Sequence, residues 1–204
     1  MVSLCCNHIH TLNMLGDENS TDWTTIISSV GAIIVGVLAL WFSHKQTKIA
    51  LKAKQQDEER AQIRKKLDEL YGPLLQLRMK SNLLYQKFSE NFRASDQNFS
   101  TLIYLLNGHV FTGNDDVLLK EIIEIGKRTE NLIHDKAGLI DDTNLRTVIL
   151  PRATTHFLVL RLAYQRALVG DISKYRSLTF PKDLDTLLEN RKKTLEDRLD
   201  KLNC

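Results

Sequence analysis

The chain has 204 residues, of which 43% are apolar and 26% are charged, a composition typical of folded proteins rather than of disordered or collagen-like chains. Its 3 Pro, 9 Gly and 7% aromatic residues leave long stretches without a helix breaker, which favours an all-α protein over a turn-rich β sandwich. The 3 Cys cannot form a disulfide framework, and no two of them have the spacing of a zinc site.

Residues 23–42 form an uncharged run that predicts a transmembrane helix. As a helix the run is about 30 Å long, which matches the hydrocarbon core of a bilayer. Trp23 and Trp41 stand near its two ends, where aromatic rings favour the headgroup level. No Lys or Arg precedes the run, so it does not have the pattern of a cleaved signal peptide. The alternative is a buried helix in a soluble core.

The charges that flank this run predict its orientation. Residues 1–22 contain three acidic residues and no basic one, whereas Lys45, Lys48, Lys52 and Lys54 follow the run. The positive-inside rule places the N-terminus outside and the C-terminal side in the cytoplasm, so we expect a plasma-membrane (bacterial inner-membrane) protein. The four lysines are expected to contact lipid headgroups, and residues 1–22, or fewer if translation starts at Met14, form a short extracytoplasmic tail.

Two patterns indicate pairing of two copies. Ser28, Ala32 and Gly36 form a small-residue stripe, which predicts a helix–helix contact in the membrane or a stripe that merely faces lipid. Residues 43–70 are expected to form a basic juxtamembrane stalk helix. Its spacing predicts a weak coiled coil along Ile49, Ala53, Gln56, Arg60, Ile63, Leu67 and Leu70, continued by Leu74 and Leu77. A parallel homodimer through span and stalk would follow, and a single charged helix is the alternative.

Residues 71–204 predict a cytoplasmic bundle of about five helices. Apolar periodicity and breakers set their expected limits at 74–91, 101–106, from Asp115 or Asp116 to Gly138, 143–168, and from Pro181 to the C-terminal end. Pro151 should kink or divide the fourth of these near Leu150.

Three local details carry further expectations. Asp142 should cap the helix that follows it. His156, beside Phe157, is expected to be a hydrogen-bonded core histidine rather than a base. Leu184, Leu188, Leu195 and Leu202 lie on one stripe of the last helix, which should pack on its own bundle, the alternative being a partner protein.

The usual enzyme signatures, such as a Gly-rich phosphate loop or His-Glu-x-x-His, are absent from the sequence. One set of residues, His109, His134, Asp135 and Asp171, resembles the ligand order of the HD superfamily of metal-dependent phosphohydrolases. The resemblance implies a divalent metal held by these four side chains and hydrolysis of a phosphoester. The alternative is that they are surface and helix-capping groups.

These patterns predict a single-pass, membrane-anchored interaction or scaffold module without a catalytic site, cofactor or bound metal. Its expected partners are the lipid bilayer, a second copy of the chain and a cytoplasmic protein. Residues 43–66 carry eight Lys or Arg against three Asp or Glu, whereas the rest after the span is nearly neutral, which argues against nucleic-acid binding. The alternative function is a membrane-tethered, HD-like phosphohydrolase.

Overall fold

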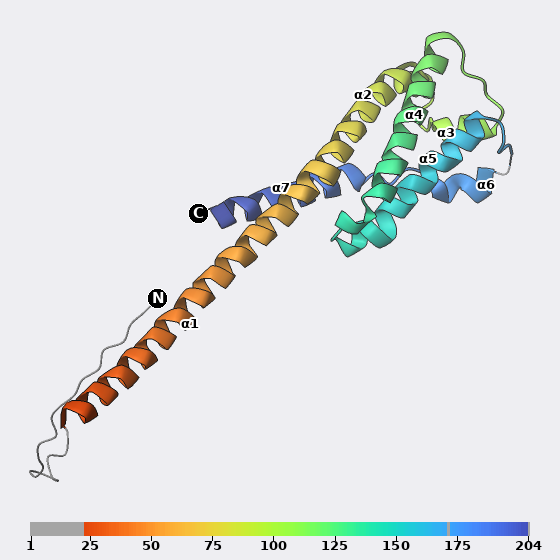
Figure 1. The fold of residues 1–204 in the computed structure, drawn as a ribbon. Helices are drawn as coiled ribbons and strands as arrows, with labels where there is room; N and C mark the ends of the chain where they lie inside the picture. The colour runs from red at the N-terminus through yellow and green to blue at the C-terminus, as the bar shows by residue number, and fades with distance from the viewer. Residues whose placement is uncertain (1–22, 171, 204) are drawn as a thin grey trace, which may run out of the picture. The chain divides into compact units, whose positions relative to one another are not determined.

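The structure, a computed structural model, describes residues 23–170 and 172–203, with side chains from residue 34 onward apart from those of 172 and 176. Every regular element among these residues is helical, which confirms the prediction of an all-α chain (Figure 1). The chain divides into two compact units, residues 1–54 and 55–204, and the boundary falls inside helix α1 (Trp23–Lys66).

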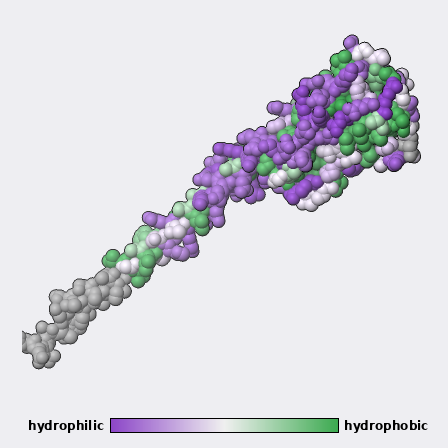
Figure 2. Space-filling view, turned by 45° about the vertical axis from the view of Figure 1, so that its right-hand side comes forward, coloured by the Kyte–Doolittle hydropathy of each residue, from purple (hydrophilic) through white to green (hydrophobic). Residues whose placement is uncertain are grey.

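In the first unit, α1 carries large apolar side chains that are exposed from Ile34 to Phe42. Figure 2 shows them as a green stretch next to the grey atoms. The Nζ of Lys45 lies 5.3 Å from the ring centroid of Trp41. Within the residues that the structure describes, no helix is both long enough and apolar enough to cross a membrane. Part of the predicted span lies outside this test, because the side chains of residues 23–33 are not described.

The second unit is a helical bundle that includes the end of α1. Helix α2 (Gly72–Ser95) packs along α4 (Gly113–Asp135), and α4 packs along α5 (Leu150–Tyr164). Helix α3 (Thr101–Leu106) lies against α5, and α7 (Leu184–Asn203) lies against the beginning of α2 (Figure 1). Short elements complete the unit: π-helical turns at Leu67–Tyr71 and Leu145–Ile149, 3-10 turns at Ala137–Leu139 and Arg176–Leu178, and α6 (Ile172–Tyr175).

Two hydrophobic clusters hold the bundle together. One, here called the α7 core, joins α7 to the end of α1 and to both π-helical turns; its members include Ile63, Leu70, Tyr71, Leu74, Leu145, Ile149, Phe157, Leu184, Leu188 and Leu195. The other, the phenylalanine core, lies between the end of α2, α3, α4 and the end of α5; it includes Phe88, Phe99, Leu102, Phe111, Leu119, Ile122 and Leu160. Burial of these apolar surfaces is the main source of the bundle's stability.

Each proline that begins a long helix follows a π-helical turn. Before Pro73, the backbone N–H of Gly72 donates to the carbonyl of Leu67, five residues back. Proline has no N–H and its ring crowds the carbonyl four residues earlier, so a widened turn lets the chain stay helical through it. A Cβ on Gly72 would stand 2.9 Å from the Leu67 carbonyl oxygen, which explains the glycine at this position.

The second such turn confirms two predictions about the helix near Pro151. The backbone N–H of Leu150 bonds to the carbonyl of Leu145 across the turn, so the helix divides at Leu150 as expected. Asp142 caps this segment, because its Oδ1 accepts a hydrogen bond of 2.8 Å from the backbone N–H of Leu145. By contrast, α4 begins at Gly113, before the Asp115 or Asp116 that was expected to cap it.

Helix α7 packs on its own bundle, as predicted. It thereby covers part of the stretch that was expected to form the stalk. Leu184, Leu188 and Leu195 are buried in the α7 core together with Ile63, Leu70 and Leu74 of the predicted coiled-coil seam. Ion pairing of Arg198 with Glu59 joins α7 to α1 as well. The second half of the seam is therefore covered by the same chain rather than by a second copy. The compact bundle accordingly starts at Gln55, within the stretch expected to form a stalk.

A partly buried cluster of charges fastens this region. The carboxylate of Asp141 lies 2.6 Å from Lys66 Nζ and 2.7 Å from Arg191 Nη2, and it accepts a hydrogen bond of 3.2 Å from the Tyr71 hydroxyl. Burial would raise the pKa of Asp141, but Arg191 and Lys66 outweigh it and hold the pKa well below its usual range. Burial, together with Asp141, raises the pKa of Tyr71 to about 12. Asp141 is therefore ionised at neutral pH, and the Tyr71 hydroxyl keeps its proton.

Candidate functional site

The HD-like residues are not brought together. His109 lies just before α4 with its ring 4.6 Å from that of Phe111, whereas His134 is in the last turn of the same helix. The 23 residues of α4 make it about 34 Å long, so the two imidazoles cannot bind one metal ion. Asp135 is next to His134, and Asp171 lies outside the described residues. No three His, Cys, Asp or Glu side chains among the described residues gather as metal ligands do.

The residues predicted to contact the membrane lie in the first unit. The side chains of Ser28 and Ala32 are outside the described part, and a Cβ on Gly36 would meet nothing within 4 Å. Lys45, Lys48, Lys52 and Lys54 are all exposed. Their contacts with another helix or with lipid headgroups remain predictions.

A large cavity, here called the junction cavity, lies in the bundle where the two hydrophobic cores meet. Its volume is about 960 Å³, at the upper end of the size of small-molecule sites. Phe157 of the α7 core and several residues of the phenylalanine core line its apolar part, namely Phe99, Leu102, Leu119, Ile122 and Leu160. Its polar part is built by α2, the start of α3, α5 and residues 179–185.

At one end of the cavity, the buried side chain of Arg78 is fixed by an ion pair, a neighbouring amide and an aromatic ring. Arg78 is 4% exposed, and its guanidinium donates from Nε to Asp185 Oδ1 (2.8 Å) and from Nη2 to Asp185 Oδ2 (3.1 Å). The amide of Asn82 completes the arrangement, accepting 2.9 Å from Arg78 and donating 2.7 Å to Asp185. The guanidinium also lies 4.1 Å from the centroid of the Phe180 ring.

This pair is electrically balanced. Burial would raise the pKa of Asp185, but hydrogen bonds from Arg78 and Asn82 and the charge of Arg78 outweigh it, so the pKa falls below its ordinary value. Arg78 and Asp185 therefore carry opposite full charges at neutral pH. They fix the geometry of this wall without adding net charge to the cavity.

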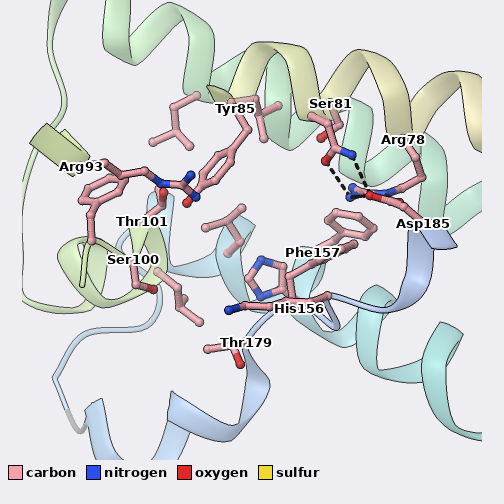
Figure 3. Close-up of a pocket in the computed structure, with 18 of the residues that line it drawn as sticks. Arg78, Ser81, Tyr85, Arg93, Ser100, Thr101, His156, Phe157, Thr179 and Asp185 are labelled. Carbon is pink, nitrogen blue, oxygen red and sulfur yellow. Dashed lines mark hydrogen bonds and ion pairs between the residues drawn. The ribbon is translucent and has the colours of Figure 1, made fainter. Parts of the chain in front are cut away.

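His156 lies in the middle of the cavity beside Phe157, between the labelled groups at its two ends (Figure 3). Its Nδ1 is 2.8 Å from the carbonyl oxygen of Leu178, which can only accept, so Nδ1 carries the proton. Burial lowers the pKa of His156, aided by the charge of Arg78 and opposed by the bond to Leu178. The ring is therefore neutral at pH 7, with an acceptor at Nε2. The expected internal hydrogen bond of His156 is confirmed, although the side chain is part-buried and lines the cavity rather than lying in either hydrophobic core.

The opposite end of the cavity gathers a cation and hydroxyl groups. Figure 3 shows Arg93, Tyr85, Ser100 and Thr101 together there, away from Arg78 and Asp185. The guanidinium carbon of Arg93 lies 5.3 Å from the centroid of the Tyr85 ring. Thr101 is only 5% exposed, and its buried Oγ1 has no hydrogen-bond partner among the described residues. A buried hydroxyl left in this way is rare in folded proteins.

A second cation, Lys182, lines the cavity from the segment that leads into α7. Arg93 and Lys182 are both exposed, and neither forms an ion pair within the described part of the chain. The cavity therefore combines an apolar floor, one balanced ion pair and two cations without carboxylate partners. Such a surface suits a ligand that is apolar at one part and negatively charged at another.

Sequence reasoning missed most of this site. The 3.5-residue spacing assigned Leu77 to the apolar seam, whereas the structure buries Arg78 and leaves Leu77 half-buried. The signal that was available is an arginine next to the apolar positions Leu74, Leu75 and Leu77, together with Asp185 at the start of the last helix. Thr101 and Lys182 carry no pattern of their own, because only folding brings their segments together.

Comparison with known proteins gives no assignment: no protein-family model, curated protein or solved structure matches the chain.

Proposed function

We propose that the protein is a single-pass, membrane-anchored interaction module. In this proposal residues 23–42 span the bilayer with the N-terminus outside, and the bundle of residues 55–204 stands in the cytoplasm. The observation that carries the proposal is the exposure of large apolar side chains along α1, among them Val35 (66%), Leu38 (51%) and Leu40 (72%). Contiguous apolar surface of this kind is stable in lipid or against another protein, and not in water.

The charges beside this surface support the same proposal. Lys45, Lys48 and Lys52 are exposed on the turns of α1 that directly follow Phe42. A lysine near an anionic leaflet gains about 1 kcal/mol, so three of them add materially to the attachment. Because residues 1–22 contain no Lys or Arg, the asymmetry favours a cytoplasmic bundle.

We propose that two copies pair only through the part of α1 before Gln55. Ile49 and Leu51 are 61% and 55% exposed there, whereas α7 covers the seam from Ile63 onward. Oxidative cross-linking of Ile49→Cys in membranes, in a background without native cysteines, tests this part. We expect covalent dimers from Ile49→Cys and none from Val110→Cys, an exposed position in the bundle.

Carbonate washing of vesicles that contain the full chain tests the anchor. We expect the protein to stay with the lipid pellet at high pH, because an inserted helix is held by the hydrophobic effect and not by charge. Release into the supernatant would show that the attachment is peripheral and would overturn the proposed span.

The three native cysteines give a direct test of orientation, because two lie near the start and one at the end of the sequence. One variant, Cys204→Ser, keeps Cys5 and Cys6; the other, Cys5→Ser with Cys6→Ser, keeps Cys204. A membrane-impermeant maleimide added to intact cells should label the first variant and should label the second only after lysis. Labelling of Cys204 in intact cells would overturn the orientation.

A further inference from the structure

We propose that the junction cavity binds a small amphipathic organic anion: a flat apolar body that carries a carboxylate or phosphate group. The inference concerns the bundle alone and does not depend on the membrane anchor.

The charge of the cavity is the first step. Arg78, Arg93 and Lys182 line it, against the single carboxylate of Asp185. Arg78 and Asp185 neutralise each other through two hydrogen bonds, so Arg93 and Lys182 supply the excess positive charge. In a partly enclosed site with apolar walls, this charge attracts an anion more strongly than it would on an open surface.

The buried hydroxyl of Thr101 is the second step, and it is independent of the first. Thr101 lines the cavity and is 5% exposed, yet its Oγ1 has no partner among the described residues. A buried polar group in this state is unfavourable, and a ligand oxygen is one partner that would relieve it. Because Thr101 stands beside Arg93 and Ser100 in Figure 3, the three residues define the end of the cavity that takes the anionic group.

The apolar floor is the third step, and it separates an organic anion from an inorganic one. Phe157, Leu160 and Leu119 are among the apolar residues that line the cavity. An ion such as free phosphate would leave this surface and most of the volume of about 960 Å³ unused. A planar apolar body would cover the floor and gain hydrophobic and aromatic contacts.

His156 offers one further contact to a ligand that carries a suitable donor. Its Nδ1 is committed to the carbonyl of Leu178, so the neutral ring can offer only Nε2, as an acceptor. A ligand with an O–H or N–H group on its apolar body would satisfy this nitrogen. His156 therefore contributes to recognition of the body and not to the charge that binds the anion.

Binding of three simple probes to the full chain in detergent tests the proposal. They are 1-naphthyl phosphate, which has both required parts, 1-naphthol, which lacks the phosphate, and inorganic phosphate, which lacks the rings. Titration calorimetry, with protein-free micelles as the blank, should show 1-naphthyl phosphate binding at least tenfold more tightly than either of the others. Equal affinity for 1-naphthyl phosphate and inorganic phosphate, or for 1-naphthyl phosphate and 1-naphthol, would overturn the proposal.

Substitutions locate the binding. Arg93→Gln removes the cation at the proposed anion end and should weaken 1-naphthyl phosphate about tenfold, as expected for the loss of a charge-assisted hydrogen bond. Lys182→Gln removes the second exposed cation of the cavity and should weaken binding less, through the loss of longer-range attraction. Arg152→Gln removes an exposed arginine that does not line the cavity and should leave the affinity unchanged. Both cavity substitutions lie at exposed side chains, so the bundle should stay folded. Unchanged affinity in both cavity variants would place the binding elsewhere and overturn the assignment.

Discussion

Arg78 of α2 and Asp185 of α7 form a two-bond ion pair that joins the beginning of one helix to the beginning of another, 107 residues apart in the sequence. The arginine is almost completely buried, while the aspartate side chain keeps 29% of its exposure. The pair therefore ties the α7 core to the wall of the junction cavity. Its removal should affect stability before it affects any ligand.

Arg78→Met is expected to destabilise the bundle by about 3 kcal/mol, the lower end of the range for breaking a buried ion pair, because Asp185 is left partly solvated. Chemical denaturation of the full chain measures the change. The double variant Arg78→Met with Asp185→Leu should recover most of the loss, since a well-packed apolar pair is nearly neutral relative to an ion pair. Lys80→Met, which breaks the exposed pair with Glu121, serves as the control and should cost less than about 1 kcal/mol.

Gly126→Ala is expected to destabilise the contact between α4 and α5. A Cβ at position 126 would lie 2.9 Å from Cδ1 of Phe157, so the ring must move, at about 1–3 kcal/mol for overpacking. Alanine's better helix propensity alone would stabilise α4, so a net loss identifies the clash. Gly138→Ala, where nothing lies within 4 Å, should be close to neutral. A neutral Gly126→Ala variant would show that Phe157 has room to move.

The stability of the bundle should decline as the pH falls below about 6.5, in part because of His156. The pKa of this group is lowered in the folded state, so the unfolded chain binds the proton more readily and low pH favours unfolding. Above the unfolded pKa the contribution of His156 is constant. His156→Asn keeps a donor for the Leu178 carbonyl and should reduce the slope of stability against pH. An unchanged slope between pH 5 and 7 would contradict this account.

Two lysines in the proposed span should prevent insertion. In Val35→Lys with Leu38→Lys, each charge costs about 2.5–3.5 kcal/mol at mid-membrane, which together match or exceed the gain of about 3–6 kcal/mol from the apolar residues of the span. Fractionation of cells should then recover the chain outside the carbonate-resistant pellet. Met79→Lys with Leu83→Lys places the same charges on exposed apolar positions of α2 and should leave fractionation unchanged.

Periodicity predicted the helices well, and physical chemistry explains why. Pro151 and Asp142 each act within a few residues, so the division at Leu150 and the cap at Leu145 could be read from the sequence. The apolar stripe of the last helix likewise predicted its packing. Contacts between distant segments could not be predicted in this way, since nothing local tells which face of α1 meets α7.

The site was harder to predict for the same reason. The internal hydrogen bond of His156 was predicted correctly, because a histidine beside Phe157 in an apolar helix needs one internal partner. The other groups of the junction cavity come from α2, α3 and the segment before α7. They form a site only because the fold makes them neighbours in space. The metal-ligand interpretation of His109 and His134 shows the converse: their order in the chain suggested a site, but the length of α4 keeps them apart.

The turn at Leu67–Tyr71 acts as an angular phase shift. Each residue of an α-helix turns by about 100°, whereas a π turn takes up one extra residue within a single turn, so each residue after it faces the direction that the preceding residue would have in an uninterrupted α-helix. Downstream of the turn the inward face runs through Leu74, Arg78 and Ser81, one step away from the line that Leu77 would continue. Replacing this turn by a regular α-helical turn of the same number of residues would rotate everything after it by about 100°, turn Arg78 away from the interior and separate it from Asp185. The direction of the Arg78 side chain therefore depends on the interruption of the α-helix at Leu67–Tyr71.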